Sequence, residues 1–223
     1  MIMKKLCVLL LALLLTTAFC ACKSESADQT DAEEATEAVV MSYVLKPAPQ
    51  NDEKVDVESL LTAKSILEKR LSGTGKDYSV TLDEKARQLT VTCPGSLLTD
   101  LLTRKGVLAI IDPDGVKRLG NADVKSAEVK TNDKDEEYYL SMVLTDTGAK
   151  TFADLTRASV GKETEVYLDN VMLCSAVVYA PITDGKVELH GGFTHEQAIM
   201  NANLINGGDL PYAMEIVSSK EAE

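Results

Sequence analysis

The sequence predicts an α+β fold made of two ferredoxin-like modules, each with the element order β-α-β-β-α-β and the second with an extra strand. Three observations support this class. Short β-branched or alternating apolar segments, typical of strands, recur along the chain. Between them lie longer segments whose apolar residues are spaced as on one face of a helix. This succession occurs twice, in residues 39–115 and in residues 137–218.

The first module, residues 39–115, is expected to begin with a β-branched strand that ends at Pro47. A helix with leucines at helical spacing follows, and Gly73 closes it as a C-cap. Next come a hairpin of two alternating strands and a short helix that ends at Gly106. The expected elements are a strand at 39–45, a helix at 56–71, strands at 78–82 and 89–93, a short helix at 97–102 and a strand at 107–111.

The second module, residues 137–218, follows a polar segment, 116–136, that shows no clear periodicity and is expected to be a linker. Its second helix starts with a capping box, in which the Thr194 hydroxyl and the Gln197 amide satisfy free backbone N–H groups. The expected elements are a strand at 138–144, a helix at 149–160, strands at 165–168, 171–178 and 186–189, a helix at 194–205, a strand at 213–217 and a tail at 219–223.

The N-terminus has the pattern of an export signal with a lipid attachment site. Two lysines precede an apolar run at 6–15, which is too short to span a membrane because a helical span needs about 20 residues. Ala21 stands directly before Cys22, as in a bacterial lipobox, where the cysteine thiol is acylated and the chain is cut just before it. We therefore expect a lipoprotein signal peptide at 1–21 and lipidation at Cys22. The alternative is an ordinary secretory peptide cut near Ala21.

The segment 22–38 is expected to be a disordered acidic tether, because it contains no large apolar residue and many acids. Together with the export signal and lipidation at Cys22, the tether predicts a protein at the cell membrane, anchored by lipid on the extracytoplasmic face. The chain of 223 residues has a formal net charge of −12, which repels phosphate backbones and argues against nucleic-acid binding. Aromatic residues make up only 4%, which argues against stacking platforms for nucleic acid or sugar rings.

The sequence predicts no catalytic residue, metal site or cofactor. Its two histidines, His190 and His195, lack convergent partners and are expected to be a strand-end residue and a surface helix residue. The segment 112–115 lacks the spaced acids of a calcium loop and is expected to be a turn. Cys93 and Cys174 lie in predicted strands, where buried free thiols and a disulfide are both open alternatives.

Several short segments between residues 137 and 217 occur in a characteristic order. The most diagnostic is Gly191-Gly192-Phe193-Thr194, followed by 196–198. The other segments are 144–156, 160–162, 166–171, 175–178, 181–182, 207–211 and 215–217. In order and spacing, this series resembles the head of the large periplasmic domain of the SecD family. The first module resembles the base of that domain more loosely, through 66–71 and 91–95.

The resemblance implies a fold and a surface that handles polypeptide. SecD is a membrane subunit that works with SecF and the proton gradient to pull exported chains outward. No segment of this sequence resembles the transmembrane bundle of SecD, so we expect the protein to lack the motor. The loop from Ala180 to Phe193 is expected to be a mobile apolar patch that contacts unfolded chain. Its candidate peptide-contact residues are Pro181, Ile182, Gly191, Gly192 and Phe193.

These observations lead to a functional hypothesis and a rival. The hypothesis is a non-enzymatic lipoprotein that binds exported polypeptide or a component of the Sec translocon. The rival is an envelope lipoprotein that reuses the fold to bind an unrelated ligand or a cell-envelope protein. For the loop itself, the alternative to peptide contact is that Ile182 and Phe193 simply cover the sheet.

Overall fold

The computed structural model describes residues 39–50, 54–95, 99–132 and 137–222. The predicted signal peptide (1–21), Cys22 and the predicted tether (22–38) lie outside these residues, as does the start of the helix predicted at 97–102. Within the described ranges, no helix combines the length and the apolar character needed to cross a membrane.

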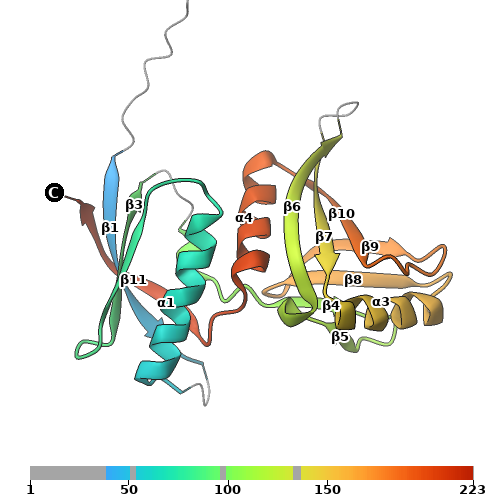
Figure 1. The fold of residues 1–223 in the computed structure, drawn as a ribbon, viewed down its shortest axis with the longest axis horizontal. Helices are drawn as coiled ribbons and strands as arrows, with labels where there is room; N and C mark the ends of the chain where they lie inside the picture. The colour runs from blue at the N-terminus through green and yellow to red at the C-terminus, as the bar shows by residue number, and fades with distance from the viewer. Residues whose placement is uncertain (1–38, 51–53, 96–98, 133–136, 223) are drawn as a thin grey trace, which may run out of the picture. The chain divides into compact units, whose positions relative to one another are not determined.

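The α+β class is confirmed, and each predicted strand and helix overlaps an observed one (Figure 1). The elements in chain order are β1 (Val40–Ala48), α1 (Val57–Ser72), β2 (Ser79–Asp83), β3 (Gln88–Pro94), α2 (Asp100–Thr103), β4 (Leu108–Ile111), β5 (Lys117–Leu119), the 3₁₀ helix η1 (Asn121–Asp123), β6 (Val124–Asn132), β7 (Glu137–Leu144), α3 (Asp146–Ala158), β8 (Glu163–Leu168), β9 (Val171–Val177), β10 (Lys186–Phe193), α4 (His195–Gly207) and β11 (Ala213–Glu221).

The first sheet has the strand order β11-β1-β3-β2, and neighbouring strands are antiparallel. Alternate strand residues such as Leu45 and Leu89 point to one face, where they form a core with Leu60 and Leu67 of α1. Because α1 follows β1 and α4 precedes β11, the order β1-α1-β2-β3-α4-β11 is that of a ferredoxin-like unit. The other elements are inserted between β3 and α4.

Two strands pair with partners other than those expected from their sequence position. β4 was expected to complete the first module, but it pairs with β8. β11 was expected to complete the second module, but it pairs with β1 along its whole length. The physical reason is that an apolar alternating pattern marks a strand without specifying its partner. β11 covers an edge of β1 that would otherwise expose unpaired backbone groups.

The segment 116–136, expected to be a linker, instead contains β5, η1 and β6. In β6, Ala127 is buried, whereas Glu128 and Lys130 face solvent and form an ion pair with an N–O distance of 2.7 Å. Because one face of β6 is charged and few residues of the other face are large and apolar, its sequence shows only a short alternation of apolar and polar residues. That is why the sequence pattern did not identify it.

The inserted elements form a second core between two antiparallel sheets, of order β10-β7-β6 and β5-β4-β8-β9. α3 and α4 contribute Phe152, Leu155 and Leu204 to this core. The Asn206 side chain of α4 pairs with the backbone of Ala127 in β6: its Oδ1 accepts from the N–H at 2.7 Å, and its Nδ2 donates to the carbonyl at 2.8 Å. This amide therefore occupies the outer edge of β6 as a neighbouring strand would.

Helix ends follow the signals in the sequence. The capping box predicted at Thr194 and Gln197 is confirmed at the start of α4. α1 begins with a similar box, in which the Asp56 carboxylate accepts from the Ser59 N–H and the Ser59 hydroxyl accepts from the Asp56 N–H. The predicted C-cap of α1 is confirmed at Gly73. These local interactions explain why the start of α4 and the end of α1 were predicted.

Arg70 of α1 links the first sheet to the inserted elements. Its guanidinium is buried and donates hydrogen bonds to four backbone carbonyl oxygens at 2.5–3.1 Å. These carbonyls belong to Leu101, Arg104, Lys105 and Gly208. Burial lowers the pKa of Arg70 to about 10, so the side chain is still charged at neutral pH. One side chain thus holds α1 to the segment around α2 and to the residue that follows α4.

Candidate functional site

A mostly apolar cavity of about 370 Å³ lies in the second core, between α3, β8, β9 and β10. Its volume is near the lower end of the range for small-ligand pockets. Apolar residues from each of these elements line it, among them Phe152, Val166, Ala176, Val177, Ile182 and Leu189. Glu188 is the one acidic residue in this lining, and its exposed carboxylate lies 3.6 Å from the His190 ring nitrogen Nε2. The cavity can therefore accept apolar groups without leaving a buried charge unpaired.

The lining includes three large apolar side chains that reach solvent. Tyr179 is 89% exposed, and Val177 and Ile182 are each more than a third exposed. Isolated exposed apolar residues are common on protein surfaces, whereas a group beside an apolar cavity suggests a binding site. The backbone N–H of Ile182 donates to the buried Thr156 hydroxyl at 3.0 Å, which fixes this segment to α3.

The five candidate peptide-contact residues do not form one loop. Ile182 lines the cavity, and Pro181 lies beside it in the exposed segment before β10. Gly191, Gly192 and Phe193 belong to β10, so the predicted strand at 186–189 is confirmed and continues to Phe193, where a loop was expected.

Gly191 and Phe193 have a packing role at the far end of β10. A Cβ added at Gly191 would lie 2.3 Å from the Leu173 carbonyl oxygen and 2.4 Å from the Phe193 ring. Phe193 packs against the second core, as the alternative interpretation of this residue expected. This glycine therefore allows close contact between β10 and β9, and it does not line the cavity.

Sequence reasoning missed Tyr179, Val177 and Phe152 as members of the site. The spacing in α3 identified Phe152 as a core residue, and Val177 was assigned to a strand. Tyr179 offered the one usable signal, because it is an aromatic residue directly after a predicted strand and before Ala180-Pro181. The cavity itself depends on how two sheets separate, which no local pattern specifies.

Both described cysteines are free thiols, so the disulfide alternative is not realised. Cys93 is buried in the first core, and Cys174 packs against the second. Burial raises the pKa of each thiol, and at Cys174 a backbone hydrogen bond from His190 partly opposes this. Although Cys174 lines the cavity, its thiol is protonated at neutral pH and is a weak nucleophile.

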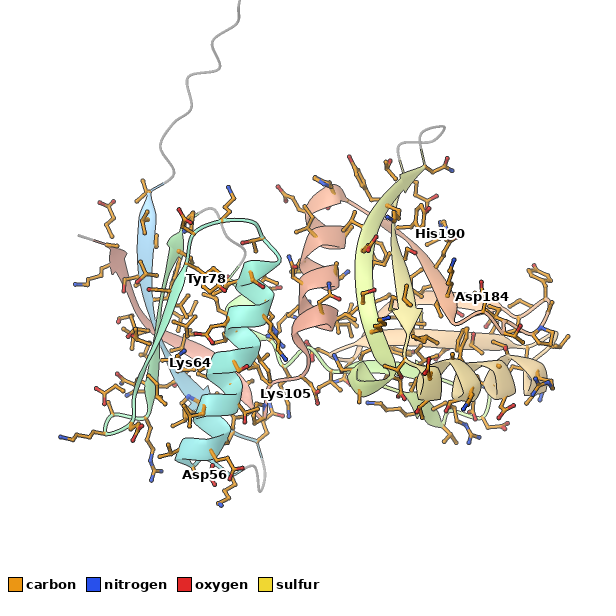
Figure 2. All side chains as sticks on the ribbon, viewed as in Figure 1. Asp56, Lys64, Tyr78, Lys105, Asp184 and His190 are labelled. Carbon is orange, nitrogen blue, oxygen red and sulfur yellow. The ribbon has the colours of Figure 1, made fainter. Side chains whose placement is uncertain are left out.

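The two histidines lie against tyrosine rings. His190 stacks on Tyr139, with ring centroids 4.6 Å apart, and His195 lies 4.7 Å from the Tyr138 ring. Figure 2 labels His190 on β10, together with Asp184 in the segment before this strand. In the parts of the chain that the structure covers, no group of three or more histidine, cysteine or acidic side chains could hold a metal ion.

The segment 112–115 forms a turn, as predicted. The Asp112 carboxylate accepts backbone hydrogen bonds from Val116 and Asp114 and pairs with Arg118. The hydrogen bond from Val116 is the largest of the effects that lower the pKa of Asp112. Its oxygens are thus engaged in holding the turn and the ion pair.

Comparison with known proteins finds similarity to subunits of a protein translocase. Residues 108–212 match the family model described as SecDF, P1 head subdomain. The protein translocase subunit SecD of Acidaminococcus fermentans is 26% identical over 181 residues, covering 79% of this chain and 43% of that protein. The same subunit of Sebaldella termitidis is 27% identical over 191 residues, covering 82% and 47%. This chain therefore spans less than half the length of these relatives.

Solved structures show the same fold. The crystal structure of SecDF in its super-membrane-facing form aligns with a TM-score of 0.68 at 20% identity, covering 81% of this chain and 30% of that chain. A second structure, of a membrane component SecDF described as enhancing protein export, aligns with a TM-score of 0.63 at 19% identity. That alignment covers 79% of this chain and 98% of the other.

Both structural alignments extend beyond the segment matched by the family model, so the likeness includes part of the first sheet as well. The apolar cavity lies within the matched segment. The resemblance seen in the motifs of the sequence is confirmed. Residues 108–212 of this chain are similar to the periplasmic head of SecD.

Proposed function

We propose that this protein is a non-enzymatic, membrane-anchored lipoprotein that binds exported polypeptide through the apolar cavity of its SecD head-like domain. The cavity and its exposed residues carry the proposal, since an unfolded chain presents the apolar side chains that such a site can bury. The relatives support the context, because they are protein translocase subunits. The protonated Cys174 thiol and the single acidic residue in the lining support a binding role rather than a catalytic one.

In-cell crosslinking tests this function. A photo-crosslinking phenylalanine analogue at position 179 is expected to capture pulse-labelled exported chains, because Tyr179 is 89% exposed beside the cavity. Adding Ile182→Asp is expected to reduce capture several-fold, because a carboxylate replaces an apolar lining group. The same analogue at Leu61, an exposed position on α1, is the control and is expected to capture few such chains.

The captured proteins also decide between the two functional hypotheses. Crosslinks to exported chains or to translocon components support the proposal. Capture confined to cell-wall or solute-uptake proteins would instead support the rival, an envelope lipoprotein with an unrelated ligand. Equal capture from positions 179 and 61 would show that the cavity is not the site.

The proposed membrane anchor rests on the sequence around Cys22 and needs its own test. Cys22→Ser is expected to abolish metabolic labelling with radioactive palmitate, because serine lacks the thiol that is acylated. The variant should also shift the protein from the membrane fraction, since acyl chains contribute about 0.8 kcal/mol per buried CH₂ to membrane binding. Cys20→Ser is the matched control and should leave labelling unchanged. Palmitate incorporation that survives Cys22→Ser would exclude this residue as the attachment site.

A further inference from the structure

We propose that the cavity binds its ligand as a β-strand: an extended polypeptide segment inserts between β9 and β10 and hydrogen-bonds to the outer edge of β9. This inference rests on the proposed function and specifies how the polypeptide is recognised. Recognition through the backbone tolerates many sequences, which suits a protein that handles different exported chains.

β9 and β10 are edge strands that face each other across the cavity. Within the described residues, β9 pairs only with β8 and β10 only with β7. The two strands meet where the His190 backbone hydrogen-bonds to the Cys174 sulfur and Gly191 lies against Leu173.

Further along, residues of both strands line the cavity, which lies between them. Ala176 and Val177 of β9 form part of one wall, and Val187 and Leu189 of β10 form part of another. The two sheets are thus joined at one end and separated by apolar space at the other. An inserted strand would occupy this space and bridge the two sheets.

The backbone directions in β9 show which groups are offered to such a strand. The Val178 N–H donates to the Lys162 carbonyl at 3.0 Å, so residue 178 faces the β8 side. Hydrogen-bonding direction alternates along an antiparallel strand, so Ala176 also faces β8, where it is paired with Thr164. The N–H and carbonyl groups of Ser175 and Val177 therefore point away from β8, toward the edge.

The edge of β6 shows the contrasting arrangement within the same domain. There, the Asn206 amide already occupies the donor and acceptor of Ala127. That edge is protected against strand addition by a side chain of this protein. The comparison favours β9, rather than β6, as the edge that accepts a partner.

Charge complementarity predicts the kind of segment that fits. Thr164 and Val166 of β8 line the cavity, so the alternate residues Glu163 and Glu165 place their carboxylates on the other face of this sheet, where they act on a bound segment at longer range. The whole chain carries a formal net charge of −12. The favoured ligand is therefore an apolar extended segment flanked by lysine or arginine, bound more tightly at low ionic strength.

The test uses the full chain and a fluorescein-labelled nine-residue peptide of alternating valine and threonine with lysine at each end. Fluorescence anisotropy is expected to show saturable binding. Methylation of alternate backbone amides of the peptide removes hydrogen bonds but keeps every side chain, and it is expected to weaken binding about tenfold or more. A peptide with glutamate at both ends is expected to bind more weakly than the lysine peptide.

A protein variant tests the same hydrogen bonds from the other side. Ser175→Pro removes an edge N–H, and proline is tolerated on edge strands, so unfolding temperature should change little while peptide affinity falls about tenfold. Ser175→Ala keeps the N–H and is expected to bind as the unaltered protein does.

The outcomes separate this inference from the function on which it rests. Absence of any peptide binding would contradict the proposed function itself. Binding that is unaffected by amide methylation and by Ser175→Pro would overturn strand insertion and leave polypeptide binding through side chains. Equal affinity for the lysine and glutamate peptides would overturn the charge preference.

Discussion

Replacing Arg70 with methionine is expected to lower the free energy of unfolding by about 3 kcal/mol or more. Methionine keeps much of the aliphatic volume but donates no hydrogen bond, so four carbonyl oxygens lose their donor. A buried polar group left unsatisfied costs about 1–3 kcal/mol, and relief of the buried charge offsets part of the total. Urea unfolding followed by circular dichroism would measure the loss.

Lys69→Met is the matched control, because Lys69 is the exposed neighbour of Arg70 on the same helix. This substitution is expected to change stability by no more than about 0.5 kcal/mol. Arg70→Lys should rescue little, since one ammonium group cannot reproduce the planar fork of guanidinium donors. Equal unfolding midpoints for Arg70→Met and Lys69→Met would contradict the role given to Arg70.

The second large effect is expected from Met214→Asp in β11. Met214 is 3% exposed within the core of the first sheet, so an unpaired carboxylate there should lower stability by about 4 kcal/mol or more. Native-state hydrogen exchange should lose protection first in β1 and β3, the strands of the same sheet.

This substitution tests the strand pairing that sequence analysis did not predict. Val217→Asp, at an exposed position of the same strand, is the control and should leave both stability and protection nearly unchanged. If protection were lost first in β7 and β8 while β1 stayed protected, β11 would belong with the second module, as its position in the sequence suggested.

Local interactions made much of the fold predictable. The Thr194 capping box, Gly73 at the end of α1 and the leucine spacing of α1 each depend on residues within one or two helical turns. These signals can be found from the sequence alone, because the hydrogen-bonding and packing partners are near neighbours along the chain. The motif around Gly191 and Gly192 likewise indicates the SecD head, because its residues are contiguous in the sequence.

The candidate site was only partly predictable for the opposite reason. Ile182 was identified from its loop, but its neighbours in the cavity come from α3, β8, β9 and β10. Phe193 was grouped with Ile182 because the two are close in sequence, whereas Phe193 lies beside Gly191 and packs against the second core. Closeness in the sequence therefore misled the prediction. β10 is extended, so it holds Phe193 at the opposite end from the segment that contains Ile182.

By itself, the sequence determined the α+β class, the order of most helices and strands, the caps at Thr194 and Gly73 and the SecD-like head. Only the tertiary structure decided that β11 pairs with β1, that β4 joins β8, that the charged segment 124–132 is a strand and that β9 and β10 enclose a cavity. The physical reason is the sequence distance over which each interaction acts. Caps and periodicity involve residues a few positions apart, whereas strand pairing and cavities depend on which strand edges and sheet faces, far apart in sequence, pack together.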